Sequence, residues 1–168
     1  SGFTLIELMV TITIVTLVTG VVMVKYSSFN NVVILKSQAY ELALDVRTAQ
    51  VYGVTAIGDN SQERGAYGMF FDTSNANQYV LFQDQDNDQQ YDAGEEIGGT
   101  YTIDSRFVIS EICTASGVCP ANEASVAFKR PDFDANISTD SSVDEGWVDI
   151  IISSRDNDVF QRVVTVYA

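Results

Sequence analysis

The residues best suited to chemistry are carboxylates spaced like the ligands of a calcium loop. Alternating carboxylates on a turning backbone can direct their oxygens at one hard cation, and Ca²⁺ accepts six to eight oxygen ligands. We therefore expect a structural calcium site outside the cell, where calcium is plentiful. The expected ligands occupy positions 1, 3, 5, 9 and 12 of a calcium loop, with a backbone carbonyl at position 7: Asp84, Asp86, Asp88, Asp92 and Glu95, with Gln90 at position 7.

This loop departs from an EF-hand in two ways. Gln89 stands where a glycine would provide the sharp turn, and no helical pattern follows Glu95. The expected site is therefore a strand-loop clip. The alternative is a solvated acidic loop, as most charge runs are. Against it, residues 84–96 hold six acids and no base, which would repel one another in a compact loop.

The two cysteines, Cys113 and Cys119, are too far apart for a thioredoxin-type redox pair. A zinc site would need further ligands that a chain with no histidine and two cysteines lacks. A disulfide, formed in an oxidising compartment, is the favoured interpretation, and two free buried thiols are the alternative. The absence of histidine removes the commonest general base. No nucleophile–base pair is visible either, so we do not expect an enzyme.

The N-terminal segment contains a carboxylate in a strongly apolar setting. Glu7 is the only charged residue in 3–24, which as a helix would span about 33 Å, enough for a hydrocarbon core of about 30 Å. Many of its residues are β-branched, but lipid forces the backbone to satisfy its own hydrogen bonds, and a helix does so. A secretory signal peptide would show a basic start and a small-residue cleavage site. Both are missing, so the segment is expected to be retained.

Beyond residue 26 the apolar pattern becomes one-sided. Apolar or small residues recur at steps of three and four up to Gly53, which predicts an amphipathic helix, and no proline interrupts 1–119. We expect one helix from near Phe3 to about Val54, ending before Gly58. It comprises a membrane or filament-core segment, 1–26, and the first part of a globular head, 27–168.

The sequence pattern of the rest of the head predicts β-strands. The expected strands alternate apolar and polar residues between glycine, asparagine and aspartate turns, and their short connections favour an antiparallel meander. A helix packed by its C-terminal half on an antiparallel sheet is an α+β fold. The expected strands are 66–72, 78–83, 101–109, 125–130, 148–153 and 160–167.

Charge is divided unevenly along the chain. Residues 1–58 carry three acids and three bases, so 59–168, with 20 acids and 6 bases, carry the whole net charge of −14. A head this acidic repels phosphate, so direct nucleic-acid binding is not expected.

The opening run of the chain resembles the class III signal of type IV pilins and type II secretion pseudopilins. The match covers Gly2-Phe3-Thr4-Leu5-Ile6-Glu7-Leu8-Met9-Val10 and the apolar tract behind it. The resemblance implies that a prepilin peptidase cleaves after Gly2, that Phe3 becomes the methylated N-terminus, and that Glu7 is needed for assembly. Residues 43–50 and 127–131 resemble the GspH/FimT-like group, some members of which are minor pilins.

The apolar setting of Glu7 is consistent with that role. A carboxylate in an apolar helix costs about 2.5–3.5 kcal/mol on insertion scales, and such residues usually have a partner. The amine of Phe3 in an adjacent subunit would offset this cost and set the register of a helical bundle. The alternative is a tolerated, protonated glutamate near the membrane interface.

Two features depart from the family pattern. Ser1 and Gly2 precede the expected mature start, so either leader residues are retained or processing differs. Many pilins also carry a proline some twenty residues into the helix, where it loosens on polymerisation, and this chain has none there. Gly20 is the weakest helical position by propensity, so we expect any melted segment in a filament to lie around it.

Three functions are therefore considered. The first is a structural subunit that polymerises with itself into a type IV pilus filament for adhesion, motility or DNA capture. The second is a minor pseudopilin of a type II secretion system, and the third is a membrane-tethered monomeric binding module. The first two imply a precursor in the inner membrane, a prepilin peptidase and an assembly machinery as partners. For the first, the expected final location is a filament at the cell surface.

Overall fold

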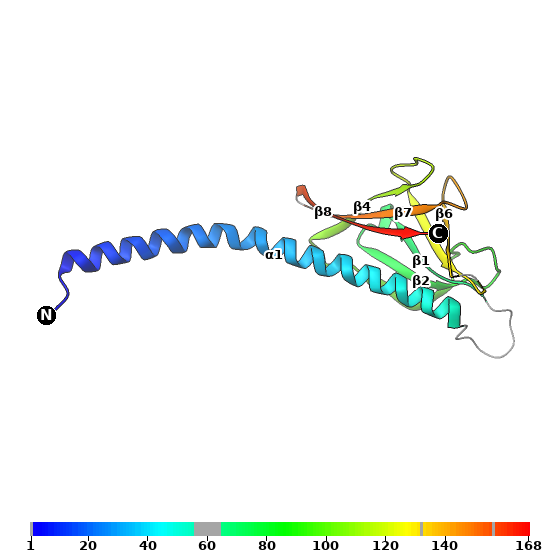
Figure 1. Ribbon diagram of the computed structural model, residues 1–168, viewed down its shortest axis with the longest axis horizontal. Helices are drawn as coiled ribbons and strands as arrows, with labels where there is room; N and C mark the ends of the chain where they lie inside the picture. Colours follow the sequence, from blue (N-terminus) through cyan, green and yellow to red (C-terminus); the bar gives the residue numbers. More distant parts are fainter. Residues whose placement is uncertain (1, 56–64, 132, 156) are drawn as a thin grey trace. The chain divides into compact units, whose positions relative to one another are not determined.

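The computed structural model describes residues 2–55, 65–131, 133–155 and 157–168. One α-helix, α1 (Leu5–Thr55), occupies the first third of the chain, which confirms the predicted long helix (Figure 1). Residue 58, before which we expected the helix to end, lies outside the described residues. The chain forms two compact units, Ser1–Ile34 and Leu35–Ala168, and α1 contributes to both.

Within the head unit, one face of α1 is buried. Leu35, Leu42, Val46 and Ala49 have between 0% and 7% of their surface exposed, at the three- and four-residue spacing of one helix face. Gly53 continues this face and lies against β5, where the backbone of Phe128 leaves no room for a side chain.

Polar contacts fix the same part of α1 to the sheet. The hydroxyl of Tyr79 donates to Asp45 Oδ2 over 2.5 Å, and the backbone N–H of Asp104 donates to Gln38 Oε1 over 2.9 Å. The α+β fold class is confirmed, because the C-terminal half of the helix packs on antiparallel β-structure.

Among its described residues, the head contains two antiparallel sheets, where we expected one meander (Figure 1). The order of the five-stranded sheet is β3-β2-β1-β5-β6 and that of the three-stranded sheet is β4-β7-β8. β1 therefore pairs with β5, and β4 with β7, across long stretches of sequence. The strands are β1 (Tyr67–Asp72), β2 (Gln78–Gln83), β3 (Glu96–Thr102), β4 (Phe107–Thr114), β5 (Glu123–Phe128), β6 (Ala135–Thr139), β7 (Trp147–Ser154) and β8 (Asn157–Tyr167).

The predicted strand 101–109 was wrong, because a turn divides it into the end of β3 and the start of β4. The Asp104 carboxylate accepts hydrogen bonds from the backbone N–H and the Nε of Arg106 and forms an ion pair with its guanidinium at 2.7 Å. These hydrogen bonds lower the pKa of Asp104 to about 2. Such a local carboxylate–backbone bond is typical of a turn and ends the strand.

Candidate functional site

The N-terminus of α1 is capped by a residue that the sequence analysis did not single out. Thr4 Oγ1 accepts a hydrogen bond from the backbone N–H of Glu7 over 3.3 Å, and the Thr4 carbonyl accepts from the N–H of Leu8 over 3.2 Å. Threonine followed three residues later by glutamate, before an apolar run, is the signature of a capping box and could have identified it.

Glu7 lies in the first turn of α1, where its carboxylate faces the positive end of the helix dipole. Its side chain is exposed in the isolated chain, as are Gly2 and Phe3, the latter at 80%. Cleavage after Gly2, methylation of Phe3 and pairing of Glu7 during assembly stay predictions.

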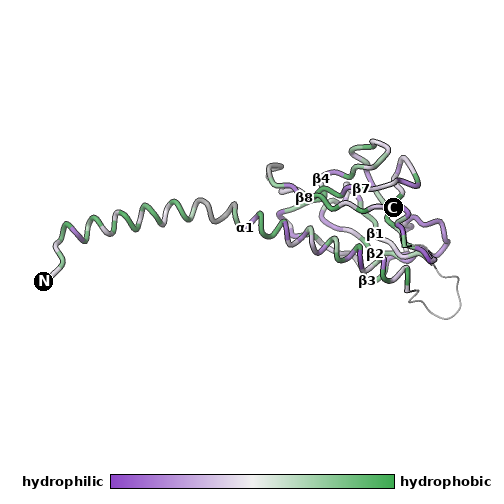
Figure 2. The backbone as a smooth tube through the Cα atoms, viewed as in Figure 1, coloured by the Kyte–Doolittle hydropathy of each residue, from purple (hydrophilic) through white to green (hydrophobic). Residues whose placement is uncertain are grey.

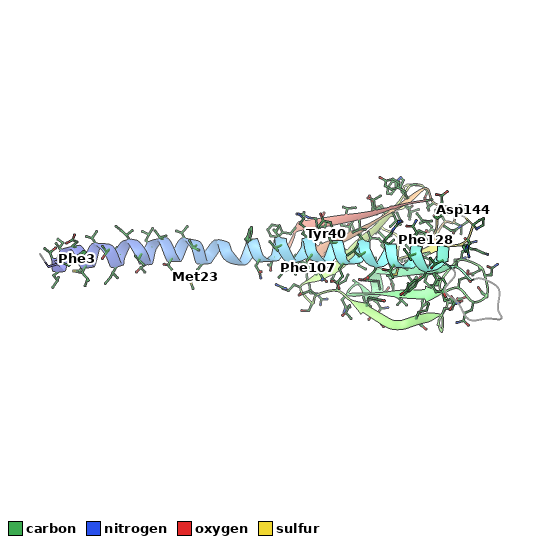
Figure 3. The ribbon with its side chains drawn as sticks, turned by 60° about the horizontal axis from the view of Figure 1, so that its bottom comes forward. Phe3, Met23, Tyr40, Phe107, Phe128 and Asp144 are labelled. Atoms are coloured by element: carbon green, nitrogen blue, oxygen red, sulfur yellow. A yellow bond between two sulfur atoms is a disulfide. The ribbon has the colours of Figure 1, made fainter. Side chains whose placement is uncertain are left out.

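The helix that follows is apolar on all sides. Leu5–Met23 comprises 19 residues with a mean hydropathy of 2.3, and none of it is buried (Figures 2 and 3). At about 1.5 Å per residue it is about 28 Å long, close to the thickness of a hydrocarbon core. An apolar helix surface of this extent would be covered by lipid or by other helices.

Three threonines of this segment are compatible with apolar surroundings because their hydroxyls are satisfied within the helix. Thr11, Thr13 and Thr16 each donate to a backbone carbonyl three or four residues earlier, over 2.7–2.9 Å. A buried hydroxyl without a partner would be costly, and these bonds remove that cost.

Gly20 lies within the continuous α1 helix of the isolated chain. A Cβ added at this position would meet no atom beyond its own helix backbone within 4 Å. The expected melting around Gly20 concerns the assembled filament and stays a prediction.

The acidic loop connects the paired strands β2 and β3, and three of its predicted ligands converge. Asp84, Asp86 and Asp88 each place one carboxylate oxygen within 4.8 Å of the others. Asp84 is buried, and its two oxygens accept the backbone N–H groups of Asn87 and Gln89 over 2.5 and 2.9 Å. Burial raises the pKa of Asp84, and the charges of Asp88 and Asp86 add to the rise.

The other predicted ligands are arranged differently. Glu95 is buried, and its carboxylate accepts the backbone N–H groups of Gln85 at 2.7 Å and Asp92 at 3.0 Å, which ties together the two ends of the loop. Within the part of the chain that the structure describes, the convergent group contains neither Glu95 nor Asp92. Gln90 donates its own N–H to Asp88 Oδ1 over 2.8 Å.

The acidic loop forms a sharp turn at Gln89, although the sequence has no glycine at that position. Gln89 adopts a left-handed backbone conformation with φ of 66°, as does Asn87 with φ of 73°. The side chain of Asn87 also accepts a hydrogen bond from Lys129, which follows β5. The backbone N–H groups that Asp84 accepts thus offset part of the repulsion among the acids. The donor set of Asp84, Asp86 and Asp88, all oxygens, suits a hard cation such as Ca²⁺.

Cys113 and Cys119 form the expected disulfide, with their Cα atoms 4.4 Å apart. The bond closes a short loop after β4. A disulfide is typical of a protein exposed to an oxidising compartment.

The N-terminal segment that contains Glu7 and the apolar helix also matches a known sequence family. Residues 1–23 match the family described as the prokaryotic N-terminal methylation motif. The comparison with curated proteins found no match, and neither did the comparison with solved structures. The motif on an apolar helix fits a precursor anchored in the membrane that then enters a surface filament, and it implies processing by a prepilin peptidase. Together with the helix-and-sheet head, it supports a precursor of type IV pilin or pseudopilin type.

Proposed function

We propose that this chain is a structural subunit that polymerises through α1 into a type IV pilus filament on the cell surface. The observation that carries the proposal is the N-terminal helix, which is apolar on all sides from Leu5 to Met23 and has one carboxylate, Glu7, in its first turn. The helix dipole favours a carboxylate in the first turn of any helix, but it does not by itself offset the cost of burying that charge among apolar groups. In a bundle of identical helices, the carboxylate can pair with the N-terminal amine of a neighbouring subunit.

Replacing Glu7 by alanine tests this role. The variant should insert into the membrane and fold its head normally but fail to enter filaments, because the pairing that sets the register is lost. Glu41→Ala is the matched control, since Glu41 is an exposed acid on the same helix within the head. Filaments are sheared from the cells, and the amount of the chain in the filament fraction and in the membrane fraction is measured by immunoblot. Normal filaments from Glu7→Ala would refute the proposal.

The main alternative is a minor pseudopilin of a type II secretion system, which shares the same N-terminal chemistry. It predicts that the chain is a trace component of any filament and that its loss impairs protein secretion. A membrane-tethered monomeric module predicts instead that the chain stays in the membrane fraction whether or not Glu7 is present.

We also propose that Ca²⁺ stiffens the loop between β2 and β3. The convergence of oxygens from Asp84, Asp86 and Asp88 supports this, as does the burial of Asp84, whose negative charge a cation would stabilise. Calorimetric titration of the purified chain with Ca²⁺ should give saturable heat and a higher melting temperature. No heat and no thermal shift at millimolar calcium would refute it.

A further inference from the structure

The part of α1 that belongs to the head has a second apolar face, opposite the buried one. Tyr40, Leu44 and Val51 are 62%, 66% and 43% exposed, and two exposed cations, Lys36 and Arg47, lie among them. At about 100° per residue, these five side chains fall within an arc of about 80°. We call them the outer stripe. The water-facing side of an ordinary amphipathic helix is polar, so this stripe is suited to a partner.

The outer stripe is positively charged on a strongly acidic protein. Lys36 Nζ lies 5.7 Å from the centre of the Tyr40 ring. The two acids of this helix segment lie outside the arc: Asp45 accepts the hydroxyl of Tyr79, and Glu41 accepts Gln38 Nε2 over 2.8 Å. Residues 59–168, by contrast, carry all of the net charge of −14. A surface that complements the stripe would combine an apolar side chain with carboxylates.

The head itself presents such a surface in the loop between β6 and β7. Val143 is 64% exposed there, between the exposed carboxylates Asp140 and Asp144. The Asp140 carboxylate accepts Asn122 Nδ2 over 2.7 Å, and the Asp144 carboxylate accepts Asn136 Nδ2 over 3.1 Å. We call residues 140–144 the acidic knob.

Buried Glu145 connects the acidic knob to the loop after β4 through hydrogen bonds. Its carboxylate accepts the backbone N–H of Ser116 over 2.9 Å and the hydroxyls of Ser116 and Ser142, and its own N–H donates to the carbonyl of Ile137 over 3.0 Å. These hydrogen bonds lower the pKa of Glu145, so it stays ionised at neutral pH. A knob that is ordered before binding loses little conformational entropy on docking.

We propose that the outer stripe of one copy docks the acidic knob of a second copy of this chain. Figure 3 shows Tyr40 near one end of the head and Asp144 near the other. A contact between two different patches is heterologous, and repeating it adds copies in an open helical series when the rotation between copies does not close a ring. The inference therefore rests on the proposed filament function and names a head-to-head contact within it.

Cysteine cross-linking in sheared filaments tests the contact. The chain carrying both Leu44→Cys and Val143→Cys should form a ladder of cross-linked multimers after mild oxidation, visible on a non-reducing gel. Each single variant should not, and neither should Leu44→Cys with Ser105→Cys, since Ser105 is an exposed residue outside the knob. Filaments that form normally without a ladder overturn this contact alone. Absence of filaments from the unsubstituted chain overturns the proposed function as well.

Charge exchange provides an independent test. Lys36→Glu with Arg47→Glu should reduce the filament yield at least tenfold, and so should Asp140→Lys with Asp144→Lys. Combining all four should restore the yield, which general misfolding would not allow. Asp140→Asn with Asp144→Asn keeps oxygen acceptors for the two asparagines and should give an intermediate yield. If Leu44→Cys is protected from a water-soluble maleimide without any cross-link to position 143, something other than the knob covers the stripe and the proposal fails.

Discussion

Replacing Gly53 by alanine tests how closely the head binds α1. Alanine is the best helix former, so in an open helix position the change would stabilise by about 1 kcal/mol. At Gly53 the added Cβ would lie 2.3 Å from the carbonyl oxygen of Phe128 and 2.9 Å from its carbonyl carbon and Cβ. The nearest obstacle is backbone at the end of β5 and has no rotamer with which to move away.

The magnitude follows from these distances. Ordinary van der Waals contact needs 3.4–4 Å, so α1 and β5 must separate by about 1 Å. That shift loosens the packing of Val46 and Ala49, which are buried on the same helix face. Overpacking of this kind costs about 1–3 kcal/mol, which exceeds the propensity gain. The middle of this range leaves a net loss of about 1 kcal/mol, or a fall of about 4 °C in Tm for a head of this size.

The assay is thermal unfolding of the purified full chain in detergent, followed by circular dichroism in the β-sheet region. Gly20→Ala is the matched control, because it is the same change in the same helix with no atom within 4 Å. The control should leave the Tm of the head unchanged. An unchanged or raised Tm for Gly53→Ala would show that the close approach to Phe128 does not exist.

Three further predictions concern the head. The hydrogen bonds to Glu145 lower its pKa below the unfolded value of about 4.5. The ionised Glu145 carboxylate therefore stabilises the folded state above that pH. This stabilisation is lost as the pH falls through the pKa of Glu145 in the folded state. Glu145→Gln should therefore lower the Tm at pH 7 but make the loss between pH 5 and pH 3 smaller, and parallel curves for both proteins would contradict this. Asp86→Asn with Asp88→Asn should abolish calorimetric Ca²⁺ binding while the calcium-free Tm changes little, and retained affinity would exclude the loop as the site. Cys113→Ser with Cys119→Ser should cost about 2 kcal/mol, measured by urea unfolding, since a disulfide across a loop this short limits the unfolded chain by about that much.

Much of the fold could be predicted because its signals are local. The long helix follows from an apolar run without proline and from one-sided spacing up to Gly53. The disulfide follows from two cysteines in a chain with no other partners for them. The capping role of Thr4 was equally local, and the threonine–glutamate spacing would have revealed it.

The arrangement of the sheets could not be predicted, since it depends on contacts distant in sequence. β6 is short and its residues are mostly small or polar, while β3 contains Gly98 and Gly99, both with positive φ, and is largely exposed. β3 does not alternate clearly, and the alternation in β6 extends over only four residues, Ala135 to Ser138. The spacing of the acids also did not predict that Asp92 and Glu95 lie outside the convergent group. A carboxylate such as that of Glu95 can accept backbone N–H groups as readily as it can bind a cation.

We propose that the chain assembles into filaments through its N-terminal helix. The most direct measurement is mass spectrometry of surface filaments sheared from cells that produce the chain, with quantification of every protein and of the N-terminal peptide. We predict that this chain is the dominant protein and that its first residue is N-methylated Phe3. A chain that remains in the membrane fraction and is missing from the filaments would contradict filament assembly through this helix.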